Sequence, residues 1–178
     1  SLMQVRVGGA SVAYNGYIYV AGGWETTGFT FRTNIEYASI NSDGSVSSWS
    51  VAGVMTLGKF KITAAVYNGY MYLIGGWVPI SGTACSVETS YNCSTVIFSD
   101  ISADGTLGDF KNANKIITPR SSHTSVIYNG YMYVIGGSDQ ASIYYDDVQY
   151  AKLGTGKVGE YSSANSLPEN RANHVAGA

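Results

Sequence analysis

Three short stretches of the chain share one pattern of apolar and aromatic residues on either side of an Asn-Gly pair. They read YNGYIYVAGG from Tyr14, YNGYMYLIGG from Tyr67 and YNGYMYVIGG from Tyr128. Asn-Gly between two β-rich runs favours a type I′ turn, because that turn needs positive φ at both central residues. Each stretch therefore predicts an antiparallel hairpin, with the tyrosines that flank the turn facing each other.

The strand that follows each turn is apolar on both of its faces. Side chains alternate along a strand, so Tyr17 and Tyr19 point to one face while Ile18 and Val20 point to the other. A strand at a solvent boundary would instead alternate apolar and polar residues. The pattern therefore predicts sheets that are covered on both faces, as when sheets pack against sheets.

These hairpins belong to a repeat of about fifty residues. A basic residue starts each unit, and the starting residues are Arg6, Lys59, Arg120 and Arg171. The units are therefore 53, 61 and 51 residues long, and the second glycine of the Gly-Gly pair always follows 17 residues after the basic residue. Nearly all the length variation falls after that pair, in the segment that leads to the next strand.

Two further strands are predicted in each unit. The third is marked by Ile35, Val96 and Val148, and the fourth follows a turn in a stretch that ends at Trp49, Phe110 or Tyr161. Four antiparallel strands per unit are typical of propeller blades. The fold class expected is an all-β propeller segment, with blade units at 6–58, 59–119 and 120–170 and with 171–178 as the first strand of a further blade.

The repeat resembles that of kelch propellers along essentially the whole chain. The resemblance rests on the aromatic residues above, on the Arg120–His123 spacing that recurs at Arg171–His174, and on the pairs Gly22-Gly23, Gly75-Gly76 and Gly136-Gly137. Gly9 and Ile62 depart from it, since they stand where the later units have His. The turns after the third strand also resemble those of bacterial secreted kelch-type arrays. Kelch-like rings contain more than three blades, which implies further blades from a longer chain or from other copies.

Composition narrows the range of partners. Charged residues make up 12% of the chain and the net charge is −2, which gives no reason to expect nucleic acid. No run approaches the roughly 18 apolar residues of a membrane span, so we expect no membrane insertion. The first ten residues lack the apolar stretch of a signal peptide, and the chain begins inside a repeat, which predicts a piece of a longer protein.

The predicted strand order places binding residues at one end of the blades. The loops between the second and third strands vary in length, and they lie at the same end as the connections between units. We predict ligand contacts there from Trp24, Trp77, Arg6, Lys59 and Arg120. Two alternatives stay open: the Trp side chains cover a blade edge, and the basic residues tie adjacent blades together.

Cys85 and Cys93 lie in the one enlarged loop, which is rich in Ser and Thr. This spacing favours a local disulfide over free thiols, and with it an oxidising, extracellular or cell-surface location. Metal binding is poorly supported, because no His and no second Cys pair lies nearby.

Catalytic patterns are weak in this sequence. His123 and His174 occupy equivalent positions of successive units, which indicates a repeated structural role. Copper oxidases that resemble galactose oxidase need several His and a crosslinked Tyr–Cys, which the chain does not supply. Asp43-Gly44 and Asp104-Gly105 favour turns over the Asp-box of sialidases, and YYDD at 144–147 lacks further calcium ligands. We therefore expect no enzyme activity and no cofactor.

Three hypotheses of function follow. The leading one is an extracellular, non-catalytic binding or adhesion module that recognises a glycan or a protein with its loop end. The second is a structural assembly subunit, whose blades pack against other copies or against missing blades. The third is part of a propeller enzyme whose catalytic residues lie in missing blades.

Overall fold

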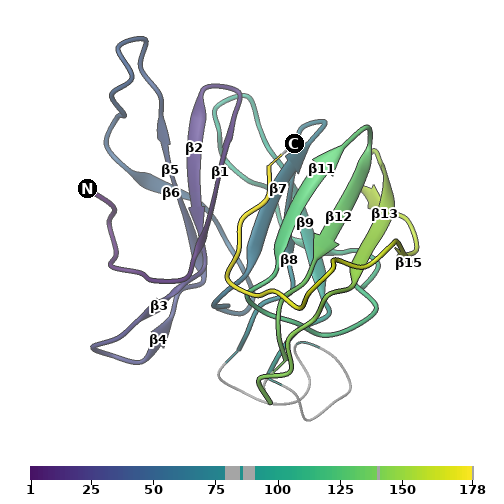
Figure 1. Cartoon of the computed structure of the whole chain (residues 1–178). Helices are drawn as coiled ribbons and strands as arrows, with labels where there is room; N and C mark the ends of the chain where they lie inside the picture. The colour runs from purple at the N-terminus through teal and green to yellow at the C-terminus, as the bar shows by residue number, and fades with distance from the viewer. Residues whose placement is uncertain (79–84, 86–90, 140, 178) are drawn as a thin grey trace.

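The computed structural model describes residues 1–78, 85, 91–139 and 141–177, and every regular element in them is a β-strand (Figure 1). The strands are β1 (Ala10–Tyr14), β2 (Tyr17–Ala21), β3 (Trp24–Glu25), β4 (Thr30–Phe31), β5 (Asn34–Ser39), β6 (Ser50–Val54), β7 (Thr63–Tyr67), β8 (Tyr70–Ile74), β9 (Val96–Asp100), β10 (Lys111–Asn112), β11 (Thr124–Tyr128), β12 (Tyr131–Ile135), β13 (Val148–Gly154), β14 (Lys157–Val158) and β15 (Ser162–Ser163). No helix in the described residues is long and apolar enough to cross a bilayer.

The strands form three antiparallel blades whose strands follow one another in chain order. The first blade is β1-β2-β5-β6 and the second is β7-β8-β9-β10. In the third, β11-β12-β13 continues into β14, while β15 also pairs with β13. β3 and β4 form a separate small hairpin in the first long loop. These sheets confirm the predicted all-β fold of four-stranded blades.

The Asn-Gly turns have the predicted geometry. Asn15, Asn68 and Asn129 have φ of 47°, 47° and 48°, and the glycine after each is also at positive φ. The flanking tyrosines pair directly, for example Tyr14 with Tyr17. The fourth strands start directly after the aromatic residues that end the predicted stretches, so that β6 follows Trp49 and β10 follows Phe110.

The core lies between neighbouring blades, as the two-sided apolar pattern predicts. On β8, Met71 and Leu73 are buried against the first blade. Tyr72 and Ile74, which alternate with them, are buried against the third blade. Both faces of the middle blade are therefore covered by other sheets.

Backbone hydrogen bonds tie each unit to the next at the start of its first strand. These bonds join the residues two positions after the basic residue of each unit. The four residues all have positive φ, and they are Gly8, Lys61, Ser122 and Asn173. The Lys61 N–H donates to Gly8 O at 2.7 Å, the Ser122 N–H to Lys61 O at 3.2 Å, and the Asn173 N–H to Ser122 O at 2.8 Å. The same backbone hydrogen bond thus connects each unit to the one before it.

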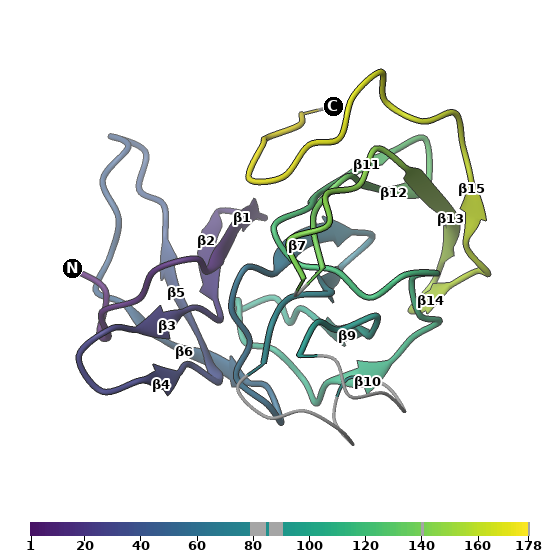
Figure 2. The ribbon, with the colours of Figure 1, turned by 60° about the horizontal axis from the view of Figure 1, so that its bottom comes forward.

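Residues 171–177 enter the fold as the earlier units do. The Gly137 N–H donates to Arg171 O at 2.7 Å, as the Gly76 N–H donates to Arg120 O at 2.9 Å. Figure 2 shows this segment, in yellow, running back from β15 toward β11. It forms no strand within the described residues, which contain no second strand of its own blade for it to pair with.

Candidate functional site

A pocket of about 570 Å³ opens at the end of the blades that carries the long loops and the connections between units. Its walls come from all three units and from the segment after Arg171. Trp24 and Trp77 both line it, which brings two of the predicted ligand-binding residues together.

The repeat explains how this pocket is built. The residue directly after each Gly-Gly pair forms a β-bridge with the residue directly after the basic one. Trp77 bridges Phe60 in the second unit, whereas Ser138 bridges Ser121 in the third. All four of these residues line the pocket. The same two backbone positions thus present aromatic rings on one side and hydroxyl groups on the other.

The aromatic wall is a continuous set of ring contacts. The Trp24 ring lies 5.7 Å from that of Phe29, 6.3 Å from that of Phe31 and 5.7 Å from that of Phe60, measured between centroids. Phe31 in turn lies 5.4 Å from Trp77. Phe29 is 76% exposed at the edge of this wall, while both Trp side chains are half-buried. The two indoles therefore cover a blade edge and also face the pocket.

The opposite wall is polar. Ser122 is buried, and its hydroxyl oxygen has no hydrogen-bond partner among the described residues, as is also true of Trp24 Nε1. Lys61 is exposed, with its ammonium 5.4 Å from the centre of the Phe60 ring. Asp139 accepts a hydrogen bond from the Ile143 N–H at 2.8 Å. Among the described lining residues, the pocket thus offers a ring surface, hydroxyl groups and the charges of Lys61 and Asp139.

Arg6 and Arg120 are buried inside their own blades and do not line this pocket. The Arg6 guanidinium pairs with Glu36 and donates to Gly22 O at 2.9 Å. Arg120 forms two bonds of 2.8 Å to the Asp147 carboxylate, which lowers the pKa of Asp147 against the raising effect of its burial. Because both guanidinium groups are buried and paired with carboxylates, neither is available to a ligand in this pocket.

Lys59 is also buried, and its side chain does not reach the pocket either. The ammonium donates to Thr95 Oγ1 at 2.7 Å, and burial lowers the pKa of Lys59 from 10.5 to about 8. The contact between adjacent blades is made by the backbone instead, since Lys59 O accepts a hydrogen bond from the Gly23 N–H at 2.8 Å.

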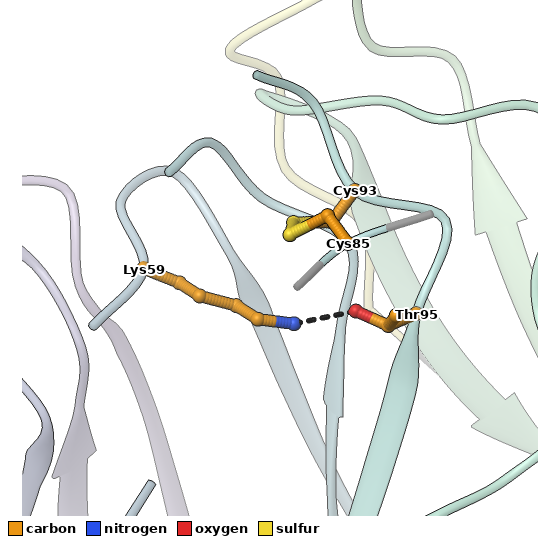
Figure 3. Close-up of a disulfide and its surroundings, with 4 residues drawn as sticks. All are labelled: Lys59, Cys85, Cys93 and Thr95. Atoms are coloured by element: carbon orange, nitrogen blue, oxygen red, sulfur yellow. Dashed lines mark hydrogen bonds between the residues drawn. A yellow bond between two sulfur atoms is a disulfide. The ribbon is translucent and has the colours of Figure 1, made fainter. Parts of the chain in front are cut away.

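Cys85 and Cys93 form the predicted disulfide, which is drawn in Figure 3. Cys93 is followed closely by β9, and its N–H donates to Gly76 O at 2.8 Å. The disulfide therefore attaches the enlarged loop to the framework at the point where the third strand begins. The remainder of that loop, 79–84 and 86–90, lies outside the described residues.

His123 and the acidic turns make structural hydrogen bonds, whereas neither ring nitrogen of His174 has a partner among the described residues. His123 Nε2 is hydrogen-bonded to the Thr63 hydroxyl at 2.9 Å, which joins the second and third blades. Asp43 accepts hydrogen bonds from the N–H and hydroxyl of Ser45, and these bonds lower the pKa of Asp43. In the YYDD stretch, Asp147 pairs with Arg120. Within the described residues, no group of three or more His, Cys, Asp or Glu is placed to hold a metal ion.

Several lining residues were not predicted. Phe60, Lys61, Ser121 and Ser122 occupy the first and second positions after the basic residue of their units. Their equivalence across units could have been found by aligning the units on that basic residue. Phe31 has structural counterparts in Asn92 and Tyr144, since each of the three forms a β-pair with the residue directly after its Gly-Gly pair. The loop between them varies in length, so the sequence gives no fixed offset from which Phe29 or Phe31 could have been found.

Comparisons with known proteins point to one fold. A family model described as Kelch motif matches residues 119–150. A solved structure described as "Structure of YjhT" matches with a TM-score of 0.71 at 13% sequence identity, over 94% of this chain and 54% of that one. The chain thus spans about half the length of that structure. A comparison with curated proteins found no match.

Proposed function

Because the chain is a segment of a β-propeller with kelch repeats, we propose that it is a non-catalytic binding module whose ligand is a glycan held in the loop-end pocket. One observation carries this proposal: a wall of aromatic rings stands opposite a wall of hydroxyl and amide groups in a single pocket. A pyranose ring has an apolar face that stacks on indole and an edge of hydroxyl groups that hydrogen-bond to polar side chains.

The buried polar atoms support the same ligand class. A buried hydroxyl or indole N–H without a partner costs free energy, and a ligand hydroxyl that bonds to it removes that cost. Ser122 Oγ and Trp24 Nε1 are two such atoms on residues that line the pocket, and because neither atom is exposed in the free protein, its side chain must turn toward a ligand to bond to it. A sugar, which carries donors and acceptors around its ring, suits both.

A protein ligand is the second candidate, and one residue favours it. Phe29 stands 76% exposed at the rim of the aromatic wall, where large exposed rings commonly anchor protein partners. The disulfide supports an extracellular or cell-surface location for either ligand, because such bonds persist in oxidising compartments.

Substitution of the two indoles tests the site. We expect Trp24→Ala and Trp77→Ala each to weaken binding at least ten-fold, which corresponds to about 1.4 kcal/mol. Glycan-array screening would identify a ligand, and calorimetry would measure its affinity. Tyr128→Ala is the matched control, since Tyr128 is an exposed aromatic at the Asn-Gly turn of the third blade, away from the loops.

The contrary result is equally clear. If Trp24→Ala and Trp77→Ala bind with full affinity while changes at the Asn-Gly turns abolish binding, the ligand occupies the other end of the blades. If no glycan binds but a protein partner does, and its binding requires Phe29, the second candidate replaces the first.

A further inference from the structure

The buried basic position of the middle unit lacks the ion pair that the other two units have. Arg6 pairs with Glu36 and Arg120 with Asp147. Among the described residues, the Lys59 ammonium has a single hydrogen bond, to the Thr95 hydroxyl (Figure 3), although the residue is only 3% exposed. A buried ammonium group has three N–H donors and is unfavourable unless it is paired.

The missing carboxylate can be traced to two sequence positions. In the third unit the carboxylate comes from the residue directly before the strand landmark Val148, and the middle unit has Thr95 there. In the first unit it comes from the residue directly after Ile35, where the middle unit has Ile97. Thr95 and Asp147 occupy equivalent places in their blades. The Gly75 N–H donates to Thr95 O and the Gly136 N–H donates to Asp147 O, both at 3.0 Å.

A backbone donor belongs to the same arrangement. Three residues before the basic residue, the Met3 N–H donates to the Glu36 carboxylate at 2.7 Å, and the Ile117 N–H donates to Gln149 Oε1 at 2.8 Å. The equivalent residue of the middle unit is Thr56. The Thr56 N–H has no acceptor among the described residues, since the side chain of Ile97, unlike those of Glu36 and Gln149, contains no oxygen.

A cavity of about 220 Å³ lies at this place. It is lined by Thr56, Leu57, Lys59, Thr95, Ile97, Phe110 and Asn112, and Lys59 is its one titratable lining residue within the described chain. Both positions that supply carboxylates in the other units, Thr95 and Ile97, are part of its wall. The cavity therefore combines a buried cation with neutral polar groups and an apolar side.

We propose that this cavity binds a small carboxylate ligand, which takes the place that Glu36 and Asp147 hold in the neighbouring blades. One carboxylate oxygen accepts hydrogen bonds from the Lys59 ammonium, and the Thr56 N–H and the Thr95 hydroxyl are further donors. Leu57, Ile97 and Phe110 surround a short alkyl substituent. The ligand class is thus a monocarboxylate with a short apolar chain.

Acetate and propionate are the probes, added to protein that is kept otherwise in carboxylate-free buffer. We expect acetate to raise the pKa of Lys59 by at least one unit at saturation, followed by NMR of the side-chain nitrogen. It should also raise the unfolding temperature at pH 7, with a smaller effect at pH 9.5, where the neutral amine attracts no anion. Propionate should act at lower concentration than acetate, while acetamide and sodium chloride should have no effect.

Three variants separate specific binding from general salt effects. Lys59→Met should lose the acetate response, whereas Lys111→Met, which removes an exposed lysine on β10, should keep it. Thr95→Asp places a carboxylate at the position of Asp147, and we expect it to raise the pKa of Lys59 without acetate and to abolish the response to it. This variant retains the ion-pair chemistry of the third blade, so it remains informative if Lys59→Met fails to fold.

Two results would overturn the proposal. One is an unchanged Lys59 pKa in saturating acetate, with equal temperature shifts in the native chain and in Lys59→Met. The other is an acetate response that appears only after Glu88→Gln, since that would assign the counter-charge to Glu88, which lies outside the described residues.

Discussion

His123 shows at the scale of one residue how burial sets charge. It is buried between two blades, with Nε2 hydrogen-bonded to Thr63, and the Ser125 hydroxyl donates to the same Thr63 oxygen at 2.8 Å. Burial, the Arg120 charge and His174 lower the pKa of His123 to about 3. The imidazole is therefore neutral throughout the physiological range of pH.

A pH dependence of stability follows from this lowered pKa. Between pH 6.5 and 3 the unfolded chain binds a proton at His123 that the folded chain does not, so stability falls as the pH falls. The loss is about 1.4 kcal/mol per pH unit where the difference is complete. We expect the stability difference between the native chain and His123→Gln to shrink by about 2 kcal/mol from pH 6 to pH 4. Urea unfolding at several pH values measures it, and parallel curves for the two proteins would contradict it.

The partners of the basic residues could not be inferred from the sequence. The regular spacing of the basic residues identified the start of each unit, but their partners lie in the third strand or directly before it, about thirty residues later, and at different positions in different units. Glu36 follows its strand landmark and Asp147 precedes its own. Without a fixed offset, the ion pairs could not be inferred, and the charges were predicted at the binding surface.

At the scale of elements, the hairpins were predictable because their signals are local. Asn-Gly turns, alternating apolar residues and Gly-Gly ends all act within ten residues, and the strands β1, β2, β7, β8, β11 and β12 match them. The fourth strands were less well placed, since two of them contain only two residues and depend on pairing with the third strand. The hairpin of β3 and β4 carries no repeat signal and was not predicted.

Two glycines of the middle blade should differ sharply when replaced by alanine. Gly69 is in the Asn-Gly turn at φ +79°, with no atom within 4 Å of an added Cβ. Gly75 ends β8 at φ +59°, where a Cβ would lie 2.7 Å from His123 Cε1 and 2.8 Å from Arg120 O.

We expect Gly69→Ala to cost about 1–2 kcal/mol from its backbone conformation alone. Gly75→Ala should cost more, about 3 kcal/mol or above, because the next blade must also move. Denaturant unfolding of both variants compares them directly. Equal costs would show that the contact between blades at Gly75 yields without loss.

At the scale of the whole molecule, a comparison of equivalent side chains shows which blade faces are not covered by another blade. Tyr72 faces the next blade and is fully buried, whereas Tyr133 at the same position of the third blade is only half-buried. Met71 faces the previous blade and is fully buried, whereas Ile18 of the first blade is half-buried. The two outer faces thus carry the residue types of a blade interface without a blade against them.

We expect the isolated 178-residue chain to associate through these faces. Each large apolar side chain that becomes buried contributes about 1.5–3 kcal/mol, and several lie on each face. Further blades of a longer chain would cover the same surfaces, as would a second copy in a structural assembly. Light scattering measures the association. A cooperatively folded monomer that binds no hydrophobic dye would contradict this prediction.

The chain-order arrangement of strands has a consequence for how the protein is made. Each blade uses one continuous unit of the sequence, so the first sheet can pair its strands before the next unit has left the ribosome. The face of this sheet that carries the tyrosines then remains exposed to solvent until the second blade packs against it. During translation the blades can therefore form one after another. Each new blade covers the exposed face of the blade before it and leaves its own outer face exposed until the next blade packs there.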